Sequence, residues 1–397
     1  MEACHSDHMA SDLVRWRERE AVALRNGVVE AIVLAGGGHL AVLRFSSGVG
    51  PQCNALWETP WDTADPGARR FAELAGEYGG LPAGPFLAAF AGHTLCMDYF
   101  GPPEKRDEAF GATLHGEAAT RTWQITPTAA GCRMDVDLPG ANLHFSRTIS
   151  LPVHGSTFLI DEQVENRSSA PRGIHWVQHL TLGPPLLDRG EAFVQASVDN
   201  CRSWPLGYEG SEAIADNVDF AWPMAPTLDG SEIDLRNPFE QKGKGFVVAA
   251  RVSPASPLAF VAASNLRIGI TLLYCFRPKD FPWIAIWEEN DARSGVPWNG
   301  TTRVRGMEFG TTPMPLGREP IRRMGQLFDT AVERILPARG TYTARYAICL
   351  TTVAADVRTL EQVAVIEDAF RLKFSDGTPD LEIAAPEAMK FFGQEIR

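Results

Sequence analysis

The sequence predicts a mostly β fold, a sandwich built as a single domain with a few short helices. From Thr120 onward, short apolar stretches alternate with turn residues at intervals of roughly ten residues, which is the spacing of sandwich strands. Hydrophobic residues make up 45% of the chain and charged residues 22%, as in ordinary soluble globular proteins. Neither a shift in composition nor a Ser/Gly linker divides the 397 residues. We therefore expect an N-terminal extension over residues 1–25 and one β-sandwich domain over residues 26–397.

The first strands are predicted to form a hairpin. Val28–Leu34 is a largely apolar, β-branched run, Gly36–Gly38 ends it, and His39–Phe45 resumes it. Glycines supply the backbone conformations that tight turns need. A dinucleotide-binding loop requires a helix after such glycines, and the strand that follows here excludes that site.

Helices are expected at few places. Asp65–Gly76 has alanines and charged residues at helical spacing. Phe86–Leu95 is apolar and fits either a helix or a buried strand, whereas Gly101–Glu108 is polar and proline-rich, which favours a loop. Helical patterns return in Gly317–Phe328, weakly, and in Arg358–Phe374.

Strands account for most of the remaining chain. In Thr157–Asn166, apolar Phe158, Ile160 and Val164 alternate with acidic residues, which is the two-residue period of a strand with one buried face. The other expected strands are Arg121–Pro127, Cys132–Leu138, Ala141–Leu151, Gly173–Gly183, Ala192–Val198, Gly245–Val252, Leu258–Ala263, Arg267–Phe276, Trp283–Trp287, Thr301–Phe309 and Thr341–Thr351.

Charge and cysteine content limit the classes of partner. The net charge of −12 argues against nucleic acid and against an anionic membrane surface, because both need a basic face. No apolar run reaches the ~18–20 residues of a membrane span, and Met1 to Arg15 is too polar for a secretion signal. The seven cysteines are scattered without a CxxC pair, which indicates reduced thiols and a cytoplasmic location. A small neutral molecule is the partner that this charge allows, while the oligomeric state is left open.

Three short strings contain candidate functional residues, and the first is Leu114-His115-Gly116-Glu117. His115 stands at a predicted junction of loop and strand, beside a glycine that lets another group approach closely. It fits an acid or a hydrogen-bond donor facing a substrate, and equally a histidine that anchors a loop.

The second string runs from His175 to Pro185. In a strand, His175 and His179 share one face, while Trp176 and Gln178 lie on the other. A metal pair would need a third ligand at suitable spacing, and none is nearby. Polar contacts to a sugar from His175, Gln178 and His179 are the better functional interpretation, with Trp176 as a core residue or a stacking platform.

The third string runs from Arg303 to Pro313, where Glu308 interrupts an apolar strand end. Alternation places Glu308 on the same face as Gly306 and Val304. Partial burial raises the pKa of a carboxyl group, which suits a general base, but a salt bridge to Arg303 or Arg305 is an equally good interpretation. Arg305 is also a candidate contact to a sugar.

The segment Trp283–Trp298 adds aromatic and acidic residues, among them Trp287, Glu288 and Trp298. Proteins hold sugars with rings that pack on C–H faces and carboxylates that accept hydroxyl protons, so Trp287 and Glu288 are candidate sugar contacts. A polar loop with tryptophans packed behind it is the alternative.

Taken together, these strings resemble the aldose 1-epimerase (galactose mutarotase-like) superfamily. The resemblance covers about residues 26 to 351 and rests on the order of several short motifs. These are Asn54-Ala55-Leu56-Trp57-Glu58, His115-Gly116 with Trp123, Val164-Glu165-Asn166-Arg167-Ser168, His179, and Gly306-Met307-Glu308-Phe309-Gly310-Thr311.

The resemblance implies a β-supersandwich and a catalytic mechanism without a metal or organic cofactor. Glu308 would remove the proton from the anomeric hydroxyl of a hexose or a derivative, and His179 would protonate the ring oxygen. The ring would open, and it would close again on the other face while His115 holds the substrate.

Some family features are changed in this chain. The Asn-Arg pair expected upstream of the first histidine is absent, Gln178-His179 replaces an Asn-His pair, and Phe309 replaces a proline. A non-catalytic carbohydrate-binding protein of the same fold is therefore the main alternative function, and a lyase or a glycosidase-associated role ranks after it.

Overall fold

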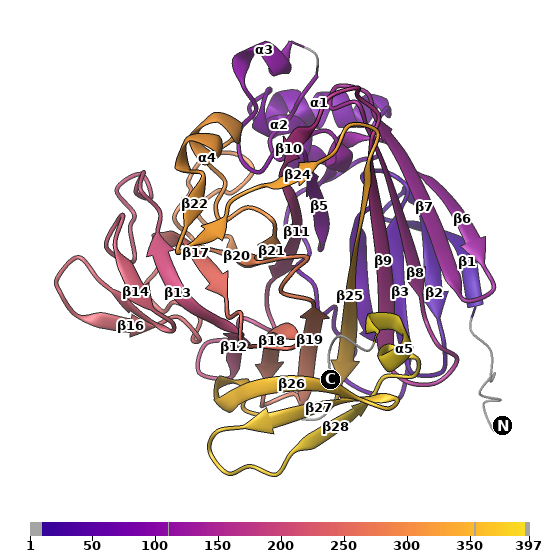
Figure 1. Cartoon of the computed structure of the whole chain (residues 1–397), viewed down its shortest axis with the longest axis vertical. Coiled ribbons are helices and arrows are strands. Elements are labelled where there is room, and N and C mark those ends of the chain that lie inside the picture. Colours follow the sequence, from indigo (N-terminus) through magenta and orange to yellow (C-terminus); the bar gives the residue numbers. More distant parts are fainter. Residues whose placement is uncertain (1–9, 110, 353–354, 394–397) are drawn as a thin grey trace.

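The computed structural model describes residues 10–109, 111–352 and 355–393. Within them, antiparallel strands form two large sheets that face each other, surrounded by smaller sheets and short helices (Figure 1). This arrangement confirms the mostly β sandwich predicted from the sequence.

The larger sheet has eight strands in the order β12-β18-β19-β25-β9-β8-β7-β6. Strand β9 covers the predicted Thr157–Asn166, and buried residues alternate with more exposed ones along its second half. The other strands are β12 (Ala192–Ala196), β18 (Ala259–Asn265), β19 (Ile270–Phe276), β25 (Thr341–Thr351), β8 (Leu143–Ser150), β7 (Gly131–Leu138) and β6 (Gln124–Thr128).

The second large sheet has seven strands in the order β14-β13-β17-β20-β21-β11-β5. Its strands are β14 (Asp219–Ala221), β13 (Val198–Ser203), β17 (Lys244–Val252), β20 (Trp283–Asn290), β21 (Arg303–Gly310), β11 (Trp176–Leu182) and β5 (Thr94–Met97). One face packs on the eight-stranded sheet. The other face points away from the main core and carries the candidate functional residues.

Smaller elements complete the fold. Short strand pairs are β10 (Arg172–Ile174) with β24 (Arg334–Leu336), β15 (Met224–Pro226) with β16 (Glu232–Asp234), and β22 (Gln326–Leu327) with β23 (Thr330–Ala331). The helices are α1 (Arg69–Glu77), α2 (Ala83–Ala89), α3 (Lys105–Glu108), α4 (Arg318–Met324) and α5 (Ala388–Phe392), with 3₁₀ turns at Ala118–Thr120 and Val357–Thr359.

The N-terminal segment forms a four-stranded meander of β1 (Ala10–Trp16), β2 (Arg19–Arg25), β3 (Val29–Leu34) and β4 (Leu40–Phe45). The predicted hairpin corresponds to β3 and β4. Residues 10–25, expected as an extension, form β1 and β2; β2 pairs with β3 and contributes Val22 and Leu24 to the main core. The domain boundary at residue 25 stays a prediction.

The helix predicted over Arg358–Phe374 is wrong. The segment forms β26 (Leu360–Ile366) and β27 (Ala369–Phe374), and β28 (Leu381–Ala384) completes a three-stranded sheet. Phe370, Leu372 and Phe374 are buried and alternate with exposed residues, a period of two that only a strand accommodates. This sheet packs on the outer face of the eight-stranded sheet, at the bottom of Figure 1.

The other helical predictions fare better. Helix α4 lies within the segment predicted for it, and α1 extends one residue beyond the predicted Asp65–Gly76. The ambiguous Phe86–Leu95 contains both structures, because α2 ends at Ala89 and β5 begins at Thr94. The expected loop Gly101–Glu108 contains the single-turn helix α3.

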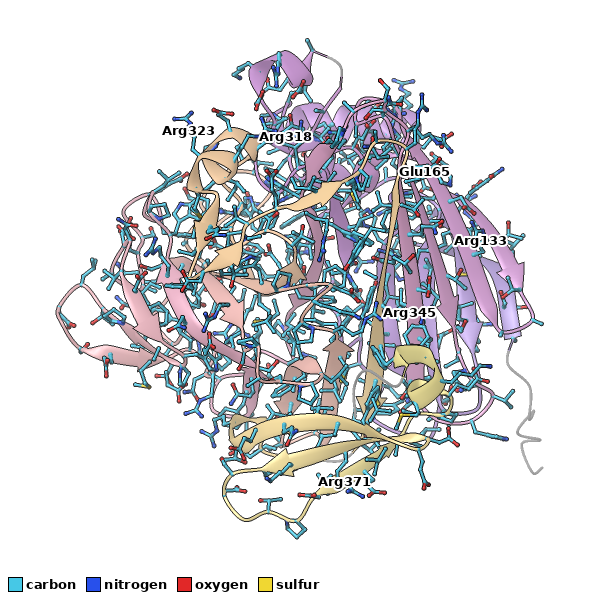
Figure 2. The ribbon with its side chains drawn as sticks, viewed as in Figure 1. Arg133, Glu165, Arg318, Arg323, Arg345 and Arg371 are labelled. Atoms are coloured by element: carbon cyan, nitrogen blue, oxygen red, sulfur yellow. The ribbon has the colours of Figure 1, made fainter. Side chains whose placement is uncertain are left out.

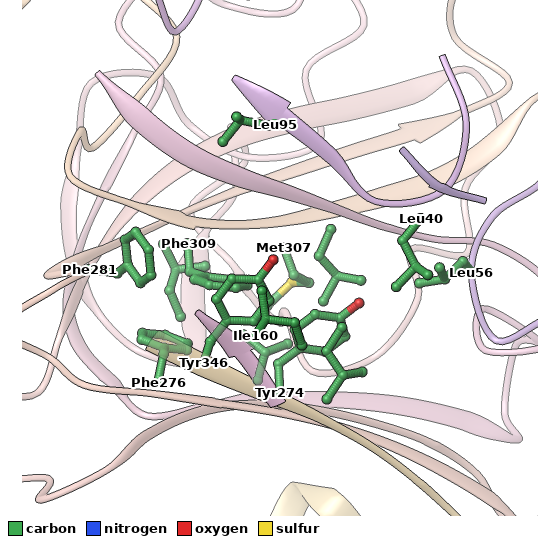
Figure 3. Close-up of a cluster of buried hydrophobic side chains, with 14 of the residues drawn as sticks. Leu40, Leu56, Leu95, Ile160, Tyr274, Phe276, Phe281, Met307, Phe309 and Tyr346 are labelled. Carbon is green, nitrogen blue, oxygen red and sulfur yellow. The ribbon is translucent and has the colours of Figure 1, made fainter. Parts of the chain in front are cut away.

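The main core lies between the two large sheets (Figure 3). Phe276 of β19 stacks on Phe309 of β21, with ring centroids 4.5 Å apart, so the two sheets meet at this contact. Phe281 packs edge-on against Phe309, and Tyr346 does the same from β25. Phe309, which replaces a proline of the family motif, is therefore a core residue.

A buried ion pair also joins the sheets. Arg147 Nε of β8 donates to Glu162 Oε1 of β9 over 2.7 Å. From the opposite sheet, Trp176 Nε1 and Gln178 Nε2 donate to Glu162 Oε2 over 3.1 and 2.6 Å. The Tyr346 hydroxyl also donates to Glu162 Oε1. Both carboxylate oxygens are thus satisfied within the core.

Among the described residues, no helix is both long and apolar enough to cross a bilayer. The described cysteines are free thiols, and all but Cys53 are buried. This agrees with the prediction of reduced core cysteines, while Cys4 lies outside the described residues.

We expect Arg147→Met to destabilise the fold by about 3–5 kcal/mol, because it leaves the carboxylate of Glu162 buried without its cation. Urea unfolding measures the change. The control is Arg371→Met in β27, whose partner Glu382 is 54% exposed, and its cost is expected to be about 0–1 kcal/mol (Figure 2). Equal costs for the two variants would contradict a central role for the buried pair.

Candidate active site

The candidate site lies on the face of the seven-stranded sheet that points away from the main core. Side chains alternate between the two faces of each strand. In the neighbouring strands β11, β21 and β20, this face carries His179, Glu308 and Trp287. His179 stands directly opposite Glu308 in the pairing of β11 with β21.

His179 and Glu308 form a buried pair. Nε2 of His179 lies 3.3 Å from Oε1 of Glu308, and both side chains are at most 5% exposed. On the other side of the ring, Nδ1 lies 3.0 Å from the hydroxyl of Thr181, which itself donates to the carbonyl of His179. The hydroxyl oxygen therefore accepts from Nδ1–H, and Nε2 faces the carboxyl group. A Cβ at Gly306 would overlap Oε1 of Glu308, so the carboxyl position depends on this glycine.

Burial shifts the proton affinity of the pair in opposite directions. Desolvation raises the pKa of Glu308 well above 4.5 and lowers the pKa of His179 to about 4. Each group alone thus disfavours its charged form. The carboxyl group and the imidazole therefore each favour the neutral form, with Oε1 of Glu308 3.3 Å from Nε2 of His179.

His115 completes the group from a different part of the chain. Its backbone is left-handed (φ 64°), and its Nδ1 accepts a hydrogen bond from the backbone N–H of Gly101 over 3.2 Å. In the neutral ring, the proton is therefore on Nε2. Burial lowers the pKa of His115 well below 6.5. The ring centroids of His115 and His179 are 5.4 Å apart, so the three predicted catalytic side chains do converge.

These side chains form the floor of a cleft of about 850 Å³. Phe86 of α2 and Phe90, which directly follows it, pack against His179, with ring centroids 6.1 and 5.4 Å away, and shield the pair from water. The cleft is also lined by Leu87, Gly101, Pro102, Leu114, Trp204, Leu206, Gly207, Tyr208, Glu209, Ser211, Val247, Trp287, Ala292, Arg293, Ser294, Gly295, Trp298 and Pro315.

The fold and the cleft can now be compared with known proteins. A candidate aldose 1-epimerase from Klebsiella pneumoniae superposes with a TM-score of 0.61 at 15% identity, over 89% of this chain and 85% of its own. The chain has the galactose mutarotase-like fold. A galactose mutarotase-like protein from Clostridium acetobutylicum (TM-score 0.55, 12% identity, 86% and 98% coverage) and a galactose mutarotase related enzyme from Lactobacillus acidophilus (0.51, 12%, 85% and 98%) agree. No family model and no curated protein matches the sequence.

Within this galactose mutarotase-like fold, four predicted sugar contacts lie outside the cleft lining. Gln178 points into the core, where its amide joins Glu162, because it alternates with His179. Glu288 and Arg305 also point inward and pair with each other, with Nε to Oε2 at 2.8 Å. Arg305 therefore forms no salt bridge with Glu308. His175 is buried before β11 begins, and its Nδ1 accepts from the N–H of Phe100.

Sequence reasoning missed part of the cleft wall. The guanidinium of Arg293 lies 5.0–5.4 Å from the ring centroids of Tyr208, Trp287 and Trp298. The hydroxyl of Tyr208 donates to the buried Glu289 over 2.8 Å. The position of Arg293 between two tryptophans was a signal that could have found it, whereas Tyr208 joins from a loop 79 residues before Trp287.

We expect Glu308→Gln to be more stable than the wild type, with a difference that grows as the pH rises above about 4.5. Above that pH the unfolded chain ionises Glu308, while the folded chain must keep it protonated, so the wild type loses stability and the glutamine variant does not. Urea unfolding at pH 4, 6 and 8 measures the difference. A difference that does not depend on pH would contradict the raised pKa, and the exposed Glu382→Gln serves as the control.

Proposed function

We propose that this protein is an aldose 1-epimerase-like enzyme that interconverts the anomers of a hexose or a hexose derivative. The observation that carries the proposal is the buried pair of Glu308 and His179, whose Oε1 and Nε2 lie 3.3 Å apart at the floor of a cleft large enough for a sugar. The galactose mutarotase-like fold supports it.

Anomer exchange needs one group that accepts a proton and another that donates one. Glu308, as carboxylate, takes the proton of the anomeric hydroxyl, and His179, as imidazolium, gives its Nε2 proton to the ring oxygen. The bond between C1 and the ring oxygen breaks, its electron pair goes to the ring oxygen, and C1 becomes an aldehyde carbon. Rotation about C1–C2 and the reverse proton transfers close the ring on the other face.

The closeness of Glu308 and His179 explains how the site can be ready for this reaction. The neutral pair and the ion pair differ only by one proton transfer between Oε1 and Nε2. Sugar hydroxyls that donate to the carboxylate stabilise the ion pair, because they replace the water that burial has removed. Nε2–H of His115 donates a hydrogen bond to the sugar oxygens and so stabilises the negative charge that develops on them.

We expect Glu308→Gln and His179→Gln each to lower the rate of anomer exchange by about 10²–10⁴-fold, the usual contribution of one general acid or base. Exchange spectroscopy by NMR on a panel of aldohexoses measures the rate. The control is His154→Gln, which removes an exposed histidine outside the cleft lining and should leave exchange unchanged. If the wild type binds sugars without exchanging them, the protein is a carbohydrate-binding protein and the enzymatic proposal is wrong.

We expect Gly306→Ala to lower exchange by about 10²-fold, because the added methyl group displaces the carboxyl of Glu308. The three atoms nearest to the methyl all belong to the flexible side chain of Glu308, so the fold should survive, as circular dichroism can verify. Gly27→Ala is the matched control, since no atom lies within 4 Å of a Cβ there. Unchanged exchange in Gly306→Ala would mean that the carboxyl position is unimportant.

A further inference from the structure

The cleft is larger than the proposed reaction requires. Its volume is about 850 Å³, while a hexose occupies about 200 Å³ if it displaces six or seven waters of ~30 Å³ each. Glu308, His179 and His115 are all buried at the floor. The outer part of the cleft is therefore available to a portion of the ligand that does not react.

Trp204 forms one wall of this outer part. It follows β13, and its backbone N–H donates to the carbonyl of Val247 in β17, which fixes its position beside the sheet. The ring is half-buried and packs near Trp283 and Met314. In the part of the chain that the structure describes, its indole N–H has no hydrogen-bond partner. The adjacent Leu206 is 71% exposed. Trp204 and Leu206 therefore form an apolar surface that also offers one free hydrogen-bond donor, the indole N–H.

Arg293 also lines the cleft. Three aromatic rings hold its guanidinium in place, yet the side chain is 39% exposed. Among the described residues, its guanidinium makes no hydrogen bond. Nε lies 3.6 Å from the carboxylate of Glu289, so the terminal N–H groups are the donors left to bind oxygen atoms of a ligand.

The charges around Arg293 favour neutral oxygens. The carboxylate of Glu289 lies 3.6 Å from Nε of Arg293 and balances its charge. Glu209, also in the cleft lining, is exposed and adds a negative charge. A phosphate or carboxylate would meet no excess of positive charge here, whereas hydroxyl groups meet free donors.

We infer that the outer part of the cleft is a subsite for a second sugar ring, so that the substrate is the reducing end of a neutral disaccharide or longer saccharide. This inference rests on the proposed function. The apolar face of the second ring lies on Trp204 and Leu206, and its hydroxyls accept hydrogen bonds from Arg293. The first ring lies on the floor, with its anomeric carbon at Glu308 and His179.

Anomer exchange on five sugars tests the subsite. We expect kcat/KM for at least one of maltose, cellobiose and lactose to exceed that for glucose and galactose by about tenfold or more. In Trp204→Ala and Arg293→Gln, the ratio of kcat/KM for the disaccharide to kcat/KM for the monosaccharide should fall toward one. Leu206→Ala should lower the same ratio with little risk to folding, because that side chain is largely exposed. The control is Leu228→Ala, an exposed leucine outside the cleft lining, which should keep the wild-type ratio.

The outcomes separate this inference from the proposed function. A wild type that exchanges the monosaccharides at least as well as every disaccharide contradicts the outer subsite and leaves the epimerase intact. Variants that lower kcat/KM for all five sugars by the same factor also contradict the outer subsite. A wild type that exchanges none of the five contradicts both proposals.

Discussion

The carboxylate of Glu162 fixes the relation between the two large sheets. It is fully buried and receives hydrogen bonds from its own sheet and from Trp176 and Gln178 of β11. These two residues can reach it only if they point inward. Since side chains alternate along a strand, His179 must then point outward, and a slip of one residue would exchange the faces. The site thus depends on a contact in the core behind it.

Burial has a second consequence, which is chemical. Desolvation lowers the pKa of His39, His93 and His175 in the same direction as that of His179. What distinguishes His179 is its partner, since it alone of these four lies within 4 Å of a carboxylate in the described residues. Throughout this fold, a shifted pKa indicates that the group is buried. It suggests catalysis only where a carboxyl group with a raised pKa and a histidine with a lowered pKa lie side by side in a cleft.

Much of the fold could be predicted because the period of two is a local property of the sequence, as Thr157–Asn166 shows. The convergence of His115, His179 and Glu308 was also accessible, through the order of the motifs. The interior positions of Gln178 and Arg305 were harder, because alternation separates the faces of a strand without telling which face is buried. The cleft wall formed by Tyr208 and Arg293 depends on two distant loops meeting, which no local pattern encodes.

The C-terminal sheet of β26–β28 determines which surface of the sandwich remains open. It covers the outer face of the eight-stranded sheet, so that β18 and β19 are buried along their whole length. The eight-stranded sheet is therefore the middle layer of three along β12, β18, β19 and β25, whereas β6 at its other edge stays largely exposed. On the seven-stranded sheet a cleft lined by loop residues remains beside His179 and Glu308, so these loops can vary and change the ligand without disturbing the layers beneath.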